Sequence, residues 1–150
     1  TTNITNNTQN IILNNYGSED LSHITDIIKT QLIKIPYSMI PKMIEAVHFN
    51  DKKPENKNIL LPNKNENKIK VYSGNRWIYK NKDEAINDLV DCKYSLLDKH
   101  FDEVTQNSKD ILSPFVKTNY LKFRKYYDEG DKELVEQLKK ECDLVFLNNR

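Results

Sequence analysis

The stretch HFNDKKPENKNILLP, at 48–62, contains residue types that hydrolytic chemistry uses. His48 can act as a general base near neutral pH, and Asn50 and Asn56 carry amide oxygens that can orient water or bind a cation. The same residues suit a tight corner, because Asn side chains satisfy backbone groups in turns and Pro54 fixes its own φ angle. The pattern therefore leaves two interpretations, an active site or a structural corner.

The enzymatic interpretation rests on a resemblance. The stretch resembles the central segment of HNH endonucleases, in which a histidine precedes asparagine and a Pro-Glu-Asn turn that leads into an apolar strand. The resemblance implies that His48 activates water, while Asn50 and Asn56 orient it or bind a divalent metal. The chain departs from the pattern at Val47, where a second histidine or an aspartate is expected. It also lacks a later His or Asn on a short helix at the expected distance.

Other catalytic motifs are absent from the sequence. The glycines are isolated from one another, which excludes Walker and dinucleotide-binding loops, and there is no GxSxG elbow or HExxH helix. The histidines fall on three different predicted segments: His23, His48 and His100. We therefore expect no catalytic residue, no metal and no cofactor. The structural corner is predicted to comprise His48, Asn50, Pro54, Glu55 and Asn56.

A second cluster combines positive charge with aromatic rings. Residues 50–82 carry nine Lys or Arg against three Asp or Glu, and residues 83–113 carry three against eight, although the net charge is only +1. Alternating apolar and polar residues in KIKVYS and RWIYK predict a hairpin with a tight turn at Ser73-Gly74-Asn75. The candidate residues for binding nucleic acid or an acidic partner are Lys68, Lys70, Tyr72, Arg76, Trp77, Tyr79, Lys80 and Lys82.

The hairpin leaves three interpretations open. An acidic protein can pair with the lysines, and nucleic acid can bind through its phosphates. Lysine lacks the planar fork with which arginine reads bases, so we expect nucleic-acid binding to be weak and tolerant of sequence. The third interpretation is a solvated basic face without a partner, because exposed ion pairs contribute little. The aromatic side chains are expected to pack within the sheet.

The N-terminal segment TTNITNNTQNIILNN, at 1–15, alternates Thr and Asn and ends in three aliphatic residues. It reads as a strand that pairs with another sheet edge or as a disordered tether. The aliphatic residues favour the strand and an assembly of several copies, with a dimer as the commonest outcome. The residues expected to form the homo-oligomer are Ile4, Ile11, Ile12, Leu13, Leu134, Val135, Leu138, Val145 and Phe146.

Helical periodicity defines the elements around these sites. Ser18 as a cap predicts a helix that Pro36 stops, and a second, short helix follows with Pro41 in its first turn. Three more helices are expected to begin at Asn81, at Ser113-Pro114 and at Asp131.

NILL, at 58–61, predicts a third short strand. The expected fold class is α+β, mostly helical with one small antiparallel sheet. We expect the segment 1–15 to be an arm and the segment 16–150 to be a single domain.

Cys92 and Cys142 are the only cysteines, and neither belongs to a pair with metal-ligand spacing. No apolar run approaches 18 residues and no signal peptide is evident. We expect an intracellular chain with two buried, reduced thiols and no membrane partner.

Several motifs in order resemble a region near the C terminus of uncharacterised proteins from giant DNA viruses of the mimivirus type. These motifs are YGSEDLSHI, IPKMIEAVHFN, KPENKNILLPN and VYSGNRWIYKNKDEAINDLV. In that family similar segments can follow a zinc-finger-like or other nucleic-acid-binding segment. The resemblance implies a viral protein in the host cytoplasm or viral factory, with a viral or host protein as partner.

The favoured hypothesis is a non-catalytic viral interaction and oligomerisation module that belongs to a larger intracellular protein. A nucleic-acid-binding domain that uses the Lys-rich hairpin is the first alternative. A degenerate HNH-like metal nuclease is the second.

Overall fold

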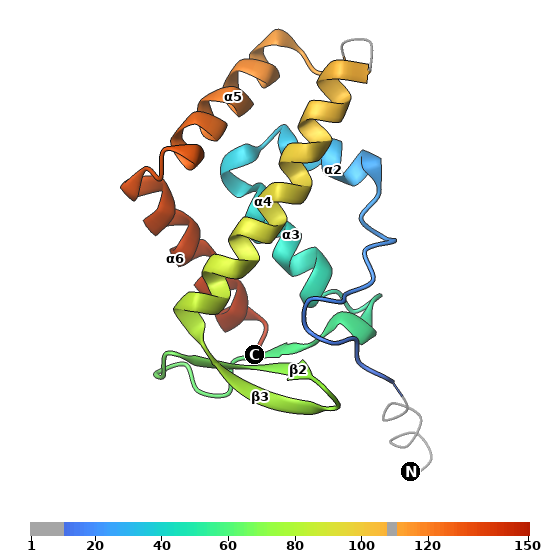
Figure 1. Cartoon of the computed structure of the whole chain (residues 1–150), viewed down its shortest axis with the longest axis vertical. Helices are drawn as coiled ribbons and strands as arrows, with labels where there is room; N and C mark the ends of the chain where they lie inside the picture. The colour runs from blue at the N-terminus through green and yellow to red at the C-terminus, as the bar shows by residue number, and fades with distance from the viewer. Residues whose placement is uncertain (1–10, 108–110) are drawn as a thin grey trace.

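The computed structural model describes residues 11–107 and 111–150, and it confirms the α+β fold class. Within these residues five α-helices stand above a three-stranded antiparallel sheet that closes one end of the helical body (Figure 1). The elements are α2 (Asp26–Ile33), α3 (Pro36–His48), the 3-10 helix η1 (Pro54–Asn56), β1 (Ile59–Leu60), β2 (Lys68–Ser73), β3 (Arg76–Asn81), α4 (Lys82–Asn107), α5 (Pro114–Asp128) and α6 (Lys132–Asn148).

Helix α3 lies at the centre of the core, in contact with α2, α4 and α6. Met39, Ile40 and Ile44 are among its fully buried side chains. The helix begins at Pro36, two residues before the predicted start at Ser38, so Pro41 lies inside it. Pro36 suits the first helical position because its fixed φ is helical and its missing N–H would have no partner there.

The predicted start of the first helix at Ser18 is wrong. Helix α2 begins at Asp26, where the Thr25 hydroxyl accepts a hydrogen bond from the Ile28 amide at 3.3 Å. The polar residues before it serve other contacts: the Glu19 carboxylate accepts from the Asn58 side-chain amide at 2.6 Å, and the Asp20 backbone amide donates to the Asn56 side-chain oxygen at 2.9 Å. Tertiary hydrogen bonds therefore replace the helix cap that the sequence offers at this point.

The sheet follows the predicted hairpin closely. Strand β2 pairs with β3 in the register Lys70↔Tyr79 and Tyr72↔Trp77, and with β1 on its other side. The turn residues Gly74 and Asn75 both have positive φ, at 61° and 65°. This conformation fits a two-residue hairpin turn and explains why Gly-Asn stands there.

Helices α4, α5 and α6 begin where the sequence predicts. Asn81, Ser113 and Asp131 cap them with side-chain oxygens that accept from backbone amides at 3.0, 3.2 and 3.1 Å. Helix α5 then runs back from the far end of α4 (Figure 1). Stacked aromatic pairs, Tyr94 with Tyr127 and Phe101 with Tyr120, connect the two helices. The Arg124 guanidinium joins this contact by donating to Asp98 at 2.9 Å.

The apolar stripe of α6 does not form an exposed oligomerisation surface. Leu134, Leu138 and Phe146 are buried within the chain itself, because α6 packs against α3 and α4. Val135 and Val145 are half-buried at the margin of this contact. Periodicity marks a helix face that must be covered, but it does not say whether the same chain covers it.

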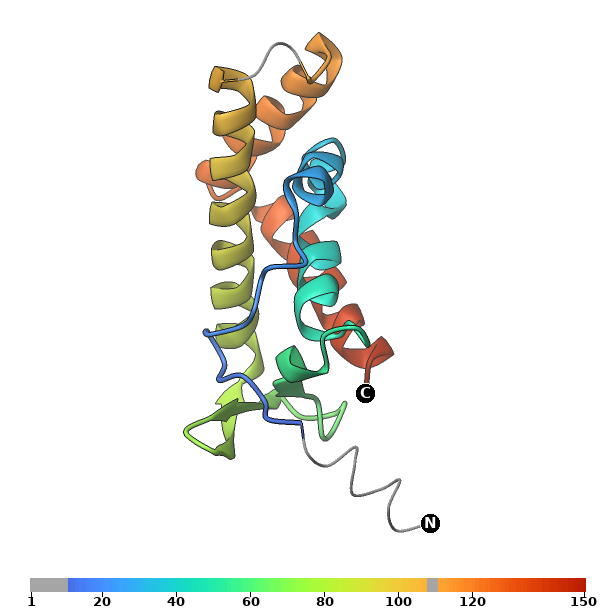
Figure 2. The same cartoon turned by 90° about the vertical axis from the view of Figure 1, so that its right-hand side faces the viewer.

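The arm prediction falls partly outside the described residues, which begin at residue 11, so nothing is assigned to Ile4. Ile11 and Ile12 are exposed and Leu13 is half-buried. The folded domain begins before the predicted boundary at residue 16, because the Asn14 amide donates a hydrogen bond to the Glu55 carbonyl at 2.7 Å. Residues 14–20, which we name the strap, continue along the corner that precedes the sheet (Figure 2).

Candidate functional site

The sheet has an inner face that packs on the helices and an outer face that does not. Ile69 and Val71 point inward and are buried, so their neighbours in β2 and the residues paired with those neighbours point outward. The outer face consists of Leu60, Lys68, Lys70, Tyr72, Trp77, Tyr79 and Asn81. Figures 1 and 2 both show this sheet at one end of the molecule, below the helices.

Lysine and aromatic side chains contact one another on the outer face. The Lys70 ammonium lies 4.9 Å from the centre of the Tyr79 ring, and the rings of Tyr72 and Trp77 meet edge to face at 5.4 Å. Tyr79 remains 61% exposed and Leu60 46% exposed. A hollow of about 330 Å³ beside Tyr79 is also lined by Asn67, Lys68, Lys80 and Asn81. These contacts hold side chains in place at a surface that solvent reaches.

Three of the predicted binding residues lie apart from this face. Lys80 points inward, where it pairs with Asp88 at 3.3 Å and lies over the Tyr16 ring. Lys82 pairs with Asp143 at 2.8 Å. Arg76 is exposed beside the turn, on the side of the hairpin that carries Lys80. The structure therefore brings together Lys68, Lys70, Tyr72, Trp77 and Tyr79.

The predicted corner contains a buried polar network that starts at His48. The Lys93 ammonium of α4 lies 3.2 Å from His48 Nε2, and His48 Nδ1 lies 2.9 Å from the Asn58 side-chain oxygen. Asn58 donates its amide to the Glu19 carboxylate at 2.6 Å. Because the Asn58 amide nitrogen is the donor there, its oxygen accepts from His48 Nδ1–H, which leaves Nε2 to accept from Lys93.

This chain of hydrogen bonds, which we name the Lys93–His48–Asn58–Glu19 relay, is buried except at Glu19, which is half-buried. His48 and Asn58 have no exposed surface and Lys93 has 2%. Burial, and after it the positive charge of Lys93, lower the pKa of His48 to about 4 against the opposing effect of Glu19. Burial also lowers the pKa of Lys93. The relay therefore keeps His48 neutral at neutral pH.

The other corner residues bind backbone groups. Asn56 is fully buried and accepts from the Asp20 amide at 2.9 Å, while its own amide donates to the Asp20 carbonyl at 2.7 Å. Asn50 is half-buried and accepts from the Lys52 amide at 3.0 Å. Pro54 opens η1, and the Glu55 carbonyl receives the Asn14 amide. Each residue stabilises the corner or the strap that crosses it.

This geometry gives no support to the nuclease interpretation. Both ring nitrogens of His48 are used inside the core, and Asn50 and Asn56 make separate local contacts. Among residues 11–107 and 111–150 there is no group of three His, Cys, Asp or Glu side chains that could hold a metal ion. A histidine in this position cannot reach the water or metal that the resemblance requires.

Comparisons with protein families, curated proteins and solved structures find no match for this chain. The resemblance to giant-virus proteins therefore stays a prediction.

In the part of the chain that the structure describes, no helix has both the length and the apolar character needed to cross a membrane. Of the two thiols predicted to be buried, Cys142 is buried, but Cys92 is exposed on α4.

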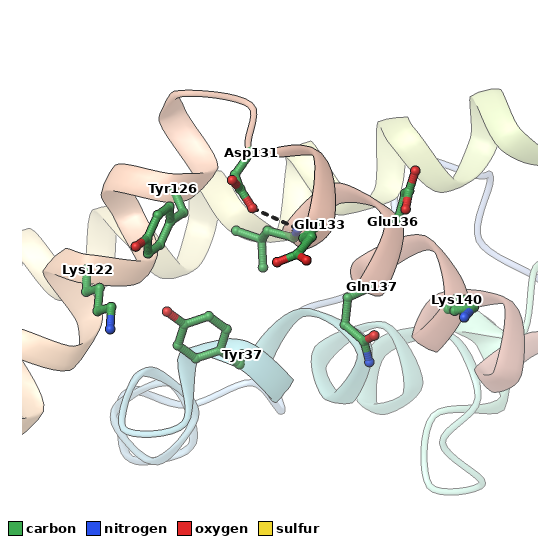
Figure 3. Close-up of a pocket in the computed structure, with 9 residues that line it drawn as sticks. Tyr37, Lys122, Tyr126, Asp131, Glu133, Glu136, Gln137 and Lys140 are labelled. Atoms are coloured by element: carbon green, nitrogen blue, oxygen red, sulfur yellow. Dashed lines mark hydrogen bonds between the residues drawn. The ribbon is translucent and has the colours of Figure 1, made fainter.

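A groove of about 780 Å³ separates α5 and α6 from the start of α3 (Figure 3). Tyr37 reaches toward it from α3, and Lys122 and Tyr126 reach toward it from α5. Its α6 side carries Asp131, Glu133, Leu134, Glu136, Gln137 and Lys140. Carboxylates and ammonium groups thus line one groove, so its charge does not select a partner of either sign.

Sequence reasoning missed the partners of His48 and one residue of the outer face. Lys93 stands on the apolar stripe of α4, between Val90 and Leu97, and a lysine in a buried position was the available signal. Asn58 and Glu19 gave no such signal, because their contact joins residues 39 apart in the sequence. Leu60 joins the outer face through the β1 register, opposite Lys70.

Proposed function

We propose that the chain is a non-catalytic binding module that recognises an acidic partner through the outer face of its sheet. The observation that carries this proposal is the composition of one surface. Lys68 and Lys70 stand among exposed or half-exposed aromatic side chains, and none of the seven residues of the outer face is acidic. A surface with one sign of charge attracts partners of the opposite sign and disfavours the rest.

The setting of this module is part of the proposal. We base it on the predicted resemblance to giant-virus proteins, which implies an intracellular viral protein whose partner is a viral or host macromolecule. The exposed side chains of Ile11 and Ile12 support self-association through the N-terminal segment, because exposed aliphatic residues gain stability when a second copy covers them.

A nucleic-acid-binding domain is the second candidate, and it is favoured by one observation. Lys68 and Lys70 share the outer face with Tyr72, Trp77 and Tyr79. Lys80 and Lys82, by contrast, lie off this face and form ion pairs with aspartates. Phosphates and bases need these two kinds of side chain on the same surface.

Retention on immobilised poly-L-glutamate tests the main proposal. The test variant is Lys68→Glu/Lys70→Glu, and the control is Lys122→Glu/Lys140→Glu, which makes the same charge change in the groove that α5 and α6 form with the start of α3. We expect the test variant to elute at a lower salt concentration than the wild type and the control to elute close to the wild type. Equal loss of retention in both variants would show that net charge alone is responsible, and the proposal would fail.

A further inference from the structure

We infer that the acidic partner of the outer face is a single-stranded nucleic acid, an inference that rests on the proposed function. The aromatic side chains decide between acidic partners. A carboxylate-rich peptide pairs with Lys68 and Lys70 but leaves the rings without a role. The bases of a single strand stack on such rings while its phosphates meet the lysines.

The two kinds of side chain form adjacent rows on the outer face. Strand β2 contributes Lys68 and Lys70. Strand β3 contributes Tyr79, opposite Lys70, and Trp77, one outward position further along and opposite Tyr72. A single strand that lies along β3 therefore places its bases over one row and its phosphates over the other. Both rows run along the sheet, which is the direction that an extended backbone follows.

The spacing of the rings fits an unstacked strand. Trp77 and Tyr79 are two residues apart on β3, which separates them by about 7 Å at the rise of a β-strand. This separation is about twice the ~3.4 Å rise per nucleotide of a stacked strand. Neighbouring bases therefore reach both rings only when the strand is extended. A duplex cannot bind in this way, because its bases stay stacked inside the helix.

Polar groups at one end of the rows are suited to base edges without selecting a sequence. Asn67 and Asn81 line the hollow beside Tyr79, together with Lys68. An amide side chain both donates and accepts, so it can serve any base. No arginine belongs to the outer face, so bidentate reading of guanine by arginine is not available there. The inferred ligand is thus a single strand of unrestricted sequence.

The chain reports on this site directly, because Trp77 is its only tryptophan. The experiment titrates the full chain with the 12-nucleotide single strands dT12 and rU12, a duplex of equal length and soluble poly-L-glutamate, and follows tryptophan emission. We expect both single strands to change the emission in a saturable manner. With phosphate contacts at Lys68 and Lys70, affinity should fall about sevenfold between 50 and 200 mM salt.

Tyr79→Leu is the test variant and Tyr126→Leu is the control, since Tyr126 is an exposed tyrosine in the groove beside α5. We expect Tyr79→Leu to weaken binding of the single strands about 5- to 150-fold and Tyr126→Leu to leave it unchanged. Equal affinity for the duplex, or equal affinity of both variants, would overturn the inference. Binding to poly-L-glutamate without binding to either single strand would overturn it while the proposed function stands. Absence of binding to all four probes would overturn both.

Discussion

At the scale of single residues, the relay explains why a histidine in a promising motif has a structural role. His48 has no exposed surface, and both its ring nitrogens are engaged by Lys93 and Asn58. Its environment favours the neutral ring, since burial and the neighbouring ammonium both disfavour a second positive charge. The residue that the sequence offers as a general base is therefore fixed in the core.

Acid should destabilise the fold through His48. Its pKa is about 4 in the folded chain, below the ordinary value of 6.5, so the unfolded chain binds a proton first as the pH falls. This contribution to stability is complete above pH 6.5 and is lost between pH 6.5 and 4, by about 3 kcal/mol. Urea unfolding at several pH values should show this decline. A free energy of unfolding that stays constant from pH 6.5 to 4.5 would contradict the burial of a neutral His48.

Removing the charge of Lys93 should raise the pKa of His48. The positive charge of Lys93 is one cause of the lowered pKa, and Lys93→Met removes that charge while filling a similar volume. NMR titration of the imidazole signals measures the change. Lys99→Met is the control, because Lys99 lies on the same helix without a place in the relay. An unchanged His48 titration in Lys93→Met would show that the two groups do not interact.

At the scale of elements, asparagine side chains of the corner bind the strap. Asn56 alone makes three hydrogen bonds to it: its oxygen accepts from the Asn14 side chain and from the Asp20 amide, and its amide donates to the Asp20 carbonyl. Asn58 adds bonds to the Asn14 carbonyl and to Glu19. The N-terminal part of the body is thus bound to the corner that leads into β1.

Asn56→Ala should therefore loosen the strap. Three buried hydrogen bonds are lost at about 1 kcal/mol each, so the free energy of unfolding should fall by about 3 kcal/mol. Amide hydrogen exchange should become faster in residues 14–20. The control Asn63→Ala, in an exposed loop where Asn63 bonds to Asn65 and Glu66, should change stability far less. Equal effects of the two substitutions would contradict the structural role of the buried asparagine.

The elements that the sequence predicts well are those defined by local signals. Ser113-Pro114 and Asp131 set their helix starts through contacts within the first turn, and Gly74-Asn75 sets the hairpin through its positive φ angles. The predicted start of the first helix at Ser18 was wrong because Glu19 and Asp20 form hydrogen bonds with distant residues. Local propensity cannot register a competing contact with a partner 36 or 39 residues away.

The binding face could be predicted in part. The residues of the hairpin were evident, but their division between two faces follows from the register, in which Lys80 pairs with Ile69 and so points inward. The α6 stripe was misassigned because the same periodicity serves a core and an interface alike. The relay could not be predicted, because the sequence does not say that α4, which carries Lys93, packs beside α3.

At the scale of the whole molecule, the N-terminal segment keeps exposed apolar side chains for the proposed assembly, whereas most of the predicted α6 residues are buried in the core. Ile12 is 85% exposed, although isoleucine favours burial. We expect Ile12→Asp to lower the mass of the homo-oligomer measured by light scattering. Ile27→Asp is the control, since Ile27 is a 72% exposed isoleucine on α2. A wild-type chain that is already monomeric in this measurement would contradict the oligomer proposal.

The most direct test of the central claim is an amide NMR titration of the full chain with dT12. The outer face of the sheet is the proposed binding surface, so signals should shift in residues 68–72 and 77–81 and at Leu60. Signals of the groove residues, such as Tyr37 and Gln137, should stay in place. Shifts confined to the groove, or no shift on the sheet at saturating dT12, would contradict the account.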